Sequence, residues 1–117
     1  MTMGERIGSL RDYDLNHPPH YWKLVGENHV PVPCESVEEW GKFFEGAKRH
    51  VADFQTENLR VSTVFLGLDH NFSGTGLPVL FETMVFGGPR DQEQRRYCTW
   101  EEAQAGHDEI VKSLGAL

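Results

Sequence analysis

Two apolar segments separated by a glycine-bearing loop constrain the fold of this 117-residue chain more than any other feature. Residues 61–68 (VSTVFLGL) and 79–86 (VLFETMVF) are rich in β-branched and aromatic side chains, which favour strands. Turn-forming residues fill the intervening segment 69–78 (DHNFSGTGLP), and a Gly-Gly-Pro sequence follows the second apolar segment. The pattern predicts a long central antiparallel hairpin.

Shorter strands are predicted on both sides of the hairpin. Pro31 and Pro33 lie two residues apart in the segment 29–34, so their missing N–H groups fall on one side of the strand. This arrangement favours a position at the edge of a sheet. Further short strands are predicted at residues 20–25, 51–56 and 96–98. A mobile polar loop is predicted at residues 87–96.

Two segments have the pattern of an amphipathic helix that begins with a capping box. In this motif a Ser or Thr and a Glu three residues later satisfy each other's free backbone N–H groups. Ser36 and Glu39 have this spacing, and so do Thr99 and Glu102. The predicted buried stripes are Val37, Trp40, Phe43, Phe44 and Ala47 in the first helix and Trp100, Ala103, His107, Ile110 and Leu114 in the second.

The order strand, strand, helix, strands, helix is typical of an α+β protein. We expect a mostly antiparallel sheet with the long hairpin at its centre and two helices packed on one face. A chain of this length forms one domain, which we place at residues 20–117. Residues 1–19 show no apolar periodicity and end in Asn-His-Pro-Pro, which predicts an extended or flexible N-terminal arm.

The apolar pattern of the hairpin also predicts which side chains share a face. The face expected beneath the helices consists of Val64, Leu66, Leu68, Val79, Phe81, Thr83 and Val85. The opposite face then consists of Val61, Thr63, Phe65, Gly67, Leu80, Glu82, Met84 and Phe86, with Glu82 opposite Phe65. This second face is too apolar for water, so we expect the arm, another subunit or a ligand to cover it.

Composition narrows the classes of partner. The chain has 18 acidic and 11 basic residues, a formal net charge of −7, which disfavours sequence-independent binding to nucleic acid. Cys34 and Cys98 are too few for a disulfide framework, so we expect reduced thiols. No apolar segment reaches transmembrane length, and the N-terminus lacks the layout of a signal peptide. We therefore expect a cytoplasmic protein that binds neither nucleic acid nor membranes.

Five residues are candidates for binding a ligand or partner. Asp69, His70 and Asn71 follow the first strand of the hairpin, in a loop where functional groups are often placed. Glu82 lies inside an apolar strand, where a carboxylate is solvated, paired with a cation, or shifted to a higher pKa. His107 lies on a buried stripe. Structural roles remain open for all five, because Asp and Asn form turns and a buried His often bonds to backbone.

Catalytic motifs are missing from the sequence. It contains neither Cys-x-x-Cys nor His-Glu-x-x-His, and the glycines at positions 74 and 76 precede no Gly-Lys-Ser/Thr. Ser73 lacks the context of a nucleophile elbow, and neither cysteine has a recognisable histidine partner. We expect no metal, no cofactor and no catalytic residue.

Three segments and a dipeptide resemble a family of small uncharacterised bacteriophage- and prophage-encoded proteins. The similar segments are 61–70 (VSTVFLGLDH), 80–87 (LFETMVFG), 97–103 (YCTWEEA) and Gly106-His107, with Trp40 as a further shared position. The similarity covers residues 21–110. Cys98 stands where a small polar residue is expected, which disfavours a required thiol there. The resemblance implies a phage origin and the cytoplasm of a bacterial host, and it assigns no activity.

The leading hypothesis is a non-enzymatic accessory protein of a phage or mobile element. It would bind a small molecule or a host or phage protein, as a homo-oligomer. One alternative is a small metal-assisted or acid/base hydrolase that uses Asp69, His70, Glu82 and His107. The other is a virion or assembly component whose apolar hairpin face is a subunit interface.

Overall fold

The computed structural model describes residues 21–46, 49–73 and 75–115, and the predicted arm at residues 1–19 and Ala47 lie outside them. Helices and strands follow each other in the predicted order, which confirms the α+β fold class. Their bounds are β1 (Trp22–Val25), β2 (Val30–Pro33), α2 (Val37–Gly46), β3 (His50–Gln55), β4 (Arg60–Phe65), β5 (Phe81–Phe86), β6 (Gln94–Tyr97) and α3 (Trp100–Ser113).

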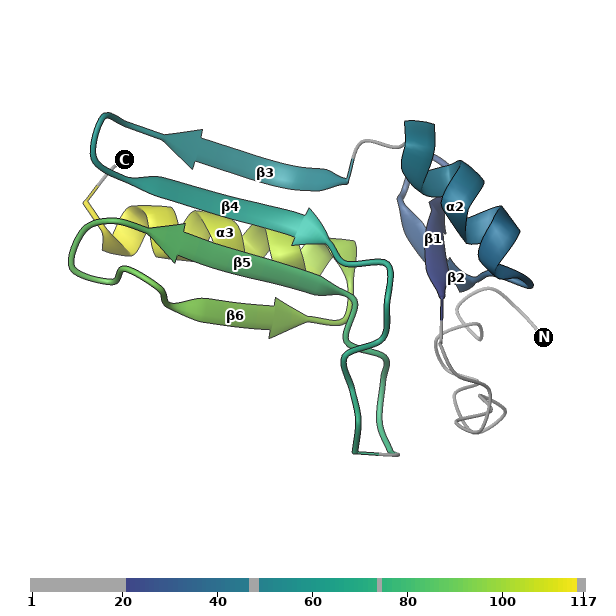
Figure 1. The fold of residues 1–117 in the computed structure, drawn as a ribbon. Coiled ribbons are helices and arrows are strands. Elements are labelled where there is room, and N and C mark those ends of the chain that lie inside the picture. The colour runs from purple at the N-terminus through teal and green to yellow at the C-terminus, as the bar shows by residue number, and fades with distance from the viewer. Residues whose placement is uncertain (1–20, 47–48, 74, 116–117) are drawn as a thin grey trace.

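Two antiparallel sheets organise the fold. The larger has the strand order β3-β4-β5-β6, so each strand pairs with its neighbours in sequence. Figure 1 shows α3 lying behind this sheet, and α3 contacts all four of its strands. β1 and β2 form the smaller sheet, and α2 packs against β1. The face of the larger sheet opposite α3 is not covered by any helix or strand of the described residues (Figure 1).

The second predicted helix, α3, begins where its capping box indicates. Thr99 Oγ1 accepts a hydrogen bond from the Glu102 N–H at 3.1 Å, and Glu102 Oε1 accepts one from the Thr99 N–H at 3.2 Å. Ala103, His107 and Ile110 are buried, which confirms the predicted stripe at its centre. Local sequence therefore determines both the start of α3 and the face that it turns toward the sheet.

The prediction of a mobile loop over residues 87–96 is wrong for its C-terminal part. β6 begins at Gln94, which pairs with Met84 of β5, and continues to Tyr97 opposite Phe81. The turn before it is closed by a hydrogen bond of 2.8 Å from the Gln92 N–H to the Val85 carbonyl. β6 is an edge strand rich in polar residues, so its composition does not reveal its strand conformation.

The strand register of the hairpin differs by one residue from the predicted one. The opposed residues are Val61 and Val85, Thr63 and Thr83, and Phe65 and Phe81, and all six are buried on the side of α3. Glu82 therefore lies opposite Val64 rather than Phe65. The predicted face is right for β5, where Phe81, Thr83 and Val85 lie on the side of α3. It is wrong for β4, where residues 61, 63 and 65 rather than Val64 lie on that side.

Hydrogen bonds explain why the hairpin face that contains threonines is the buried one. The Oγ1 atoms of Thr63 and Thr83 lie 2.5 Å apart, and Thr63 Oγ1 lies 2.8 Å from His107 Nδ1. The Tyr97 hydroxyl donates to Thr83 Oγ1 at 3.1 Å. We call these four residues the hydroxyl layer. Because each hydroxyl has a partner, the threonines are buried without the penalty of an unpaired polar group.

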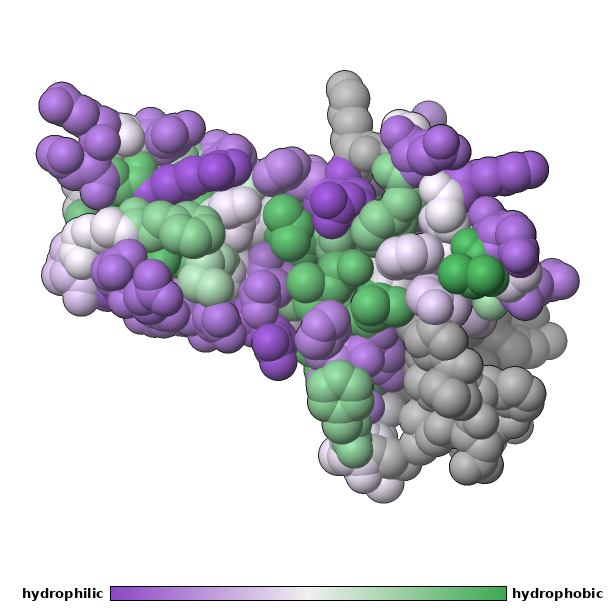
Figure 2. All heavy atoms as spheres, in the orientation of Figure 1, coloured by the Kyte–Doolittle hydropathy of each residue, from purple (hydrophilic) through white to green (hydrophobic). Residues whose placement is uncertain are grey.

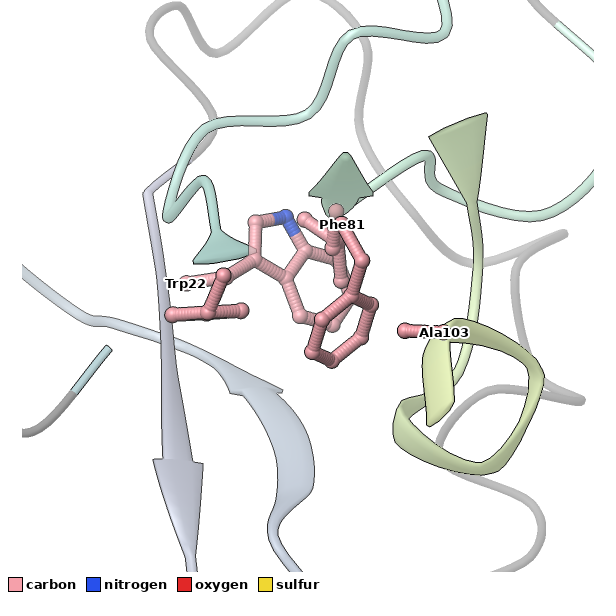
Figure 3. Packing of buried hydrophobic residues seen from close by; sticks show 5 residues of the cluster. Trp22, Phe81 and Ala103 are labelled. Carbon is pink, nitrogen blue, oxygen red and sulfur yellow. The ribbon is translucent and has the colours of Figure 1, made fainter. Parts of the chain in front are cut away.

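Apolar side chains pack on both sides of the hydroxyl layer. One cluster consists of Trp22, Phe65, Leu80, Phe81 and Ala103, and the other consists of Val61, Val85, Ile110 and Val111. Figure 3 shows Trp22 beside Phe81 and Ala103. Since Trp22 belongs to β1, the smaller sheet shares its core with the larger sheet and α3.

Gly67 forms the junction between the two sheets. Its carbonyl accepts hydrogen bonds from the Trp22 N–H at 2.8 Å and from the Trp40 indole N–H at 3.1 Å. Its φ is +80°, and a Cβ atom at this position would lie 2.2 Å from Phe44 Cζ. Glycine is therefore required for two reasons, the left-handed backbone and the close approach of the Phe44 ring.

The substitution Gly67→Ala should lower the free energy of unfolding by about 2–5 kcal/mol, from the strained backbone and the clash with Phe44 together. Gly41→Ala is the matched control, because a Cβ there meets no atom within 4 Å in α2. Alanine at that position should stabilise the protein by up to about 1 kcal/mol. Urea denaturation measures both values, and similar effects at the two glycines would contradict the role given to Gly67.

Candidate functional site

Asp69 closes the base of the loop between β4 and β5. Its Oδ1 atom accepts hydrogen bonds from the Asn71 N–H at 2.8 Å and from the Val79 N–H at 2.9 Å. The His70 N–H donates to the Val79 carbonyl at 2.9 Å. These bonds join the two sides of the loop, and Asp69 is 9% exposed. Asp69 therefore has the structural role that its residue type allows, and its carboxylate is already engaged by the backbone.

Asn71 holds the outer part of the same loop. Its Nδ2 group donates to the carbonyls of Thr75 at 2.7 Å and Leu77 at 2.8 Å. Its Oδ1 atom accepts from the Ser73 N–H at 3.0 Å and from the Ser73 hydroxyl at 2.6 Å. One side chain thus satisfies four polar groups of the loop, which fixes its path.

His70 points one nitrogen at the loop itself. Its Nδ1 atom lies 2.8 Å from the Leu68 carbonyl, which can only accept, so Nδ1 carries a proton and donates. In the neutral ring Nε2 is then an acceptor. The ring centroid lies 6.0 Å from that of Phe72. His70 is a half-buried polar neighbour of an exposed aromatic side chain rather than part of an acid–base pair.

Phe72 is the most exposed of the large apolar residues that the structure describes. Its side chain is 85% exposed, and Leu77 on the returning side of the loop is 39% exposed. Figure 1 shows this loop projecting from the end of the sheet between β4 and β5, and Figure 2 shows an apolar group near its end. Phe72 is not among the candidates predicted from the sequence, although it is the only Phe, Tyr or Trp within residues 69–78.

Glu82 and His107 lie on opposite faces of the larger sheet. Glu82 accepts a hydrogen bond of 3.0 Å from Arg96 Nε on the face opposite α3. His107 belongs to the hydroxyl layer beneath α3 and is 5% exposed. The sheet separates the two residues, and neither joins the group formed by Asp69, His70 and Asn71. The five candidate residues therefore do not converge on one site.

The hydroxyl layer holds His107 in its neutral form. The Tyr97 hydroxyl donates a hydrogen bond to Thr83 Oγ1. The hydrogen bonds then all run in one direction if Thr83 donates to Thr63 and Thr63 donates to an unprotonated His107 Nδ1. Burial lowers the pKa of His107, and the charges of Asp108 and Asp53 oppose that shift only in part. A protonated ring would have to donate from Nδ1, which reverses the direction of the hydroxyls.

Both cysteines are poorly suited to nucleophilic chemistry. Burial raises the pKa of the Cys34 thiol and of the Cys98 thiol, and nearby acidic residues add to the effect in each case. Within residues 21–46, 49–73 and 75–115, His, Cys, Asp and Glu side chains form no group of three that could hold a metal ion. No helix in these same ranges has the length and apolarity to cross a membrane.

Comparison with protein-family models, curated proteins and solved structures found no match for this chain. The resemblance to phage- and prophage-encoded proteins therefore stays a prediction.

Removing the Asp69 side chain should destabilise the protein by about 1–3 kcal/mol, because the N–H groups of Asn71 and Val79 lose their acceptor. Thr75→Ala in the same loop is the control, since Thr75 is exposed and enters the hydrogen bonds of the loop through its backbone, so the substitution should change stability by about 0.5 kcal/mol or less. Chemical denaturation of Asp69→Ala and Thr75→Ala tests this, and equal stability of the two variants would argue against Asp69 as the anchor.

Stability should fall as the pH drops from 7 towards 5. The folded state holds the pKa of His107 below its ordinary value of 6.5, so the unfolded chain takes up this proton first. Carboxylates with lowered pKa, such as Asp53, lose their stabilising effect only at lower pH. His107→Gln should flatten the dependence of stability on pH between pH 7 and 5. Thermal melts between pH 7 and 5 measure this dependence. If the slope of melting temperature against pH is the same in His107→Gln as in the wild type, His107 is not its cause.

Proposed function

We propose that this chain is a non-enzymatic binding protein that holds a protein partner with the loop between β4 and β5. The observation that carries the proposal is Phe72, a residue that is 85% exposed on a loop that is fixed by hydrogen bonds. Single exposed apolar side chains are common on protein surfaces. What supports a binding role is the combination of exposure, a fixed loop path and the neighbouring Leu77.

The energetics favour Phe72 as an anchor. Full burial of a phenylalanine side chain contributes about 1.5–3 kcal/mol relative to the exposed state. A flexible loop would lose part of that gain through ordering on binding. Here Asp69 and Asn71 already hold the loop in the free protein, so less conformational entropy remains to be lost.

The charge around the loop favours a protein over a membrane as the partner. Residues 69–78 contain no Lys or Arg, and the chain has a net charge of −7. Anionic membrane surfaces attract basic segments, so they offer no attraction to this loop. An apolar pocket on a protein accepts an aromatic ring without needing a charge. If the phage origin implied by the resemblance holds, the partner is a host or phage protein.

A non-enzymatic role is supported by the way the candidate chemical groups are engaged. Asp69 bonds to backbone N–H groups, Glu82 pairs with Arg96, and His107 lies within the hydroxyl layer. These residues have structural partners and lie in separate places. The hydrolase hypothesis lacks a shared site, and no specific observation favours it over binding.

Photo-crosslinking tests the proposal. A photoreactive phenylalanine analogue replaces Phe72 in the chain, which is expressed in its native cells, and the same analogue replaces Gln104 on the exposed side of α3 as control. We expect a discrete adduct with another protein from position 72 and none from position 104. Excess wild-type chain should compete for the adduct, whereas Phe72→Ser should not.

Phe72→Ser must keep the fold for this comparison to hold. Because the side chain is 85% exposed, its replacement should change stability by about 0.5 kcal/mol or less. The proposal fails if position 72 gives no adduct beyond that of position 104. It also fails if Phe72→Ser competes as well as the wild type.

A further inference from the structure

β3 forms one edge of the larger sheet, and Figure 1 shows no described helix or strand along its outer side. The Thr56 N–H donates to the Leu59 carbonyl at 2.7 Å, so this opposed pair is hydrogen-bonded. Hydrogen-bonded and non-hydrogen-bonded pairs alternate along an antiparallel ladder, so Phe54 also bonds to β4, whereas Asp53 and Gln55 do not. The backbone N–H and C=O groups of Asp53 and Gln55 therefore point outward from the edge.

The edge strands of this protein differ in how they are protected against further pairing. β2 contains Pro31 and Pro33, which lack the N–H group that pairing needs, and the short strand β6 carries Arg95 and Arg96. Prolines and charged side chains are the usual means by which an edge strand avoids a partner. β3 contains no Lys, Arg or Pro. Its outer side is therefore an edge at which a further strand can pair.

Two features limit how a further strand can pair with β3. A bulge between His50 and Ala52 interrupts the strand near its start, and the turn after Thr56 ends it. Regular pairing is thereby confined to residues 52–56. Two copies of this segment form two hydrogen-bonded pairs when Asp53 lies opposite the partner subunit's Gln55. Registers that place either residue opposite itself leave one such pair, because the other outward residue then meets the bulge or the turn.

The side chains of β3 select a second copy of this chain as the partner, whereas its main-chain groups alone would accept any extended segment. In the register above, the carboxylate of Asp53 meets the side-chain amide of the partner subunit's Gln55 at two symmetric places. Arg60 pairs with Asp53 at 3.0 Å, so this contact buries no unpaired charge. On the other face Phe54, which packs against the apolar cluster that contains Ile110, meets the partner subunit's Phe54. Opposed aromatic rings and opposed polar partners both stabilise an antiparallel pair, so the strand is complementary to itself.

We infer that two copies join edge to edge through β3 as a two-fold dimer with Phe54 on the axis. The axis is perpendicular to the sheet, so the two four-stranded sheets form one continuous sheet with both α3 helices on the same face. This pairing does not use the loop that carries Phe72. The dimer and the proposed function are therefore independent, and either can fail while the other stands.

Analytical ultracentrifugation of the full chain from about 1 to about 200 μM tests this inference, since the range spans a micromolar dissociation constant. Stable specific interfaces engage about 20–30 residues a side, so pairing through residues 52–56 should give a weaker, reversible dimer. The wild type should shift from monomer to dimer with rising concentration.

Proline at the edge provides a variant and a matched control. Gln55→Pro removes an N–H group that points outward, so it should keep the pairing of β3 with β4 and remain monomeric throughout. In β6, at the other edge, the Val85 N–H donates to the Glu93 carbonyl, so the Gln94 N–H also points outward. Gln94→Pro should therefore dimerise like the wild type. Circular dichroism and thermal melts confirm that each variant is folded.

A disulfide test covers the case in which Gln55→Pro does not fold. Opposed residues of a non-hydrogen-bonded pair have Cα atoms about 4.5 Å apart, which is within the range that a disulfide spans. In a Cys34→Ser, Cys98→Ser background, Phe54→Cys should form covalent dimers under mild oxidation at least about tenfold faster than Gln94→Cys.

Three outcomes would overturn the inference. The first is equal rates of disulfide formation for Phe54→Cys and Gln94→Cys. The second is a dimer that persists in folded Gln55→Pro or is lost in folded Gln94→Pro. The third is a wild type that stays monomeric over the whole concentration range, which would leave the β3 edge to a strand of another protein.

Discussion

The pairing of Thr63 with Thr83 across the central hairpin is the contact on which the rest of the structure depends. It places two hydroxyl groups side by side beneath His107 and within reach of Tyr97. A slip of β4 by one residue would turn the neighbouring Val64 toward His107 and leave the imidazole without its hydroxyl partner, and a slip of β5 would replace Thr83 with Met84 and leave Thr63 without its threonine partner. The hydroxyl layer therefore opposes register slippage in a hairpin whose two faces are both rich in apolar residues.

The same register determines which surfaces remain available for binding. With Phe65 and Phe81 opposed, regular pairing of β4 ends before Gly67, whose left-handed backbone joins the smaller sheet to the larger one. The chain then enters the loop that Asp69 and Asn71 hold in place and that exposes Phe72. On the sheet itself, α3 covers the threonine face and leaves the other face uncovered (Figure 1).

Local signals were sufficient to predict the helices and the order of strands. The capping box of Thr99 and Glu102 and the stripe that contains Ala103 and Ile110 lie within one short segment, so sequence spacing reports them directly. The register of the hairpin could not be predicted in this way. Its polar residues are satisfied by His107 and Tyr97, which come from α3 and β6, and the apolar pattern contains no information about those partners.

The candidate residues also differ in how far the sequence predicted their roles. Turn formation was one of the two roles open for Asp69 and Asn71, and their hydrogen bonds show that they fulfil it. The apolar pattern placed Glu82 on the face away from the helices and His107 on the buried stripe of the second helix, and both residues lie there. The exposure of Phe72 depends on the path of the loop in space, which residue spacing does not encode.

Cross-strand nuclear Overhauser effects test the central claim, the register of β4 and β5, most directly. Opposed residues of antiparallel strands have Cα atoms only about 4.5–5.5 Å apart, so their Hα protons report the pairing. We expect a contact between the Hα protons of Thr63 and Thr83, and contacts between the His107 ring and the Thr63 methyl group. A contact between the Hα protons of Val64 and Thr83 would contradict the account, because in that register Val64 rather than Thr63 shares the covered face with Thr83.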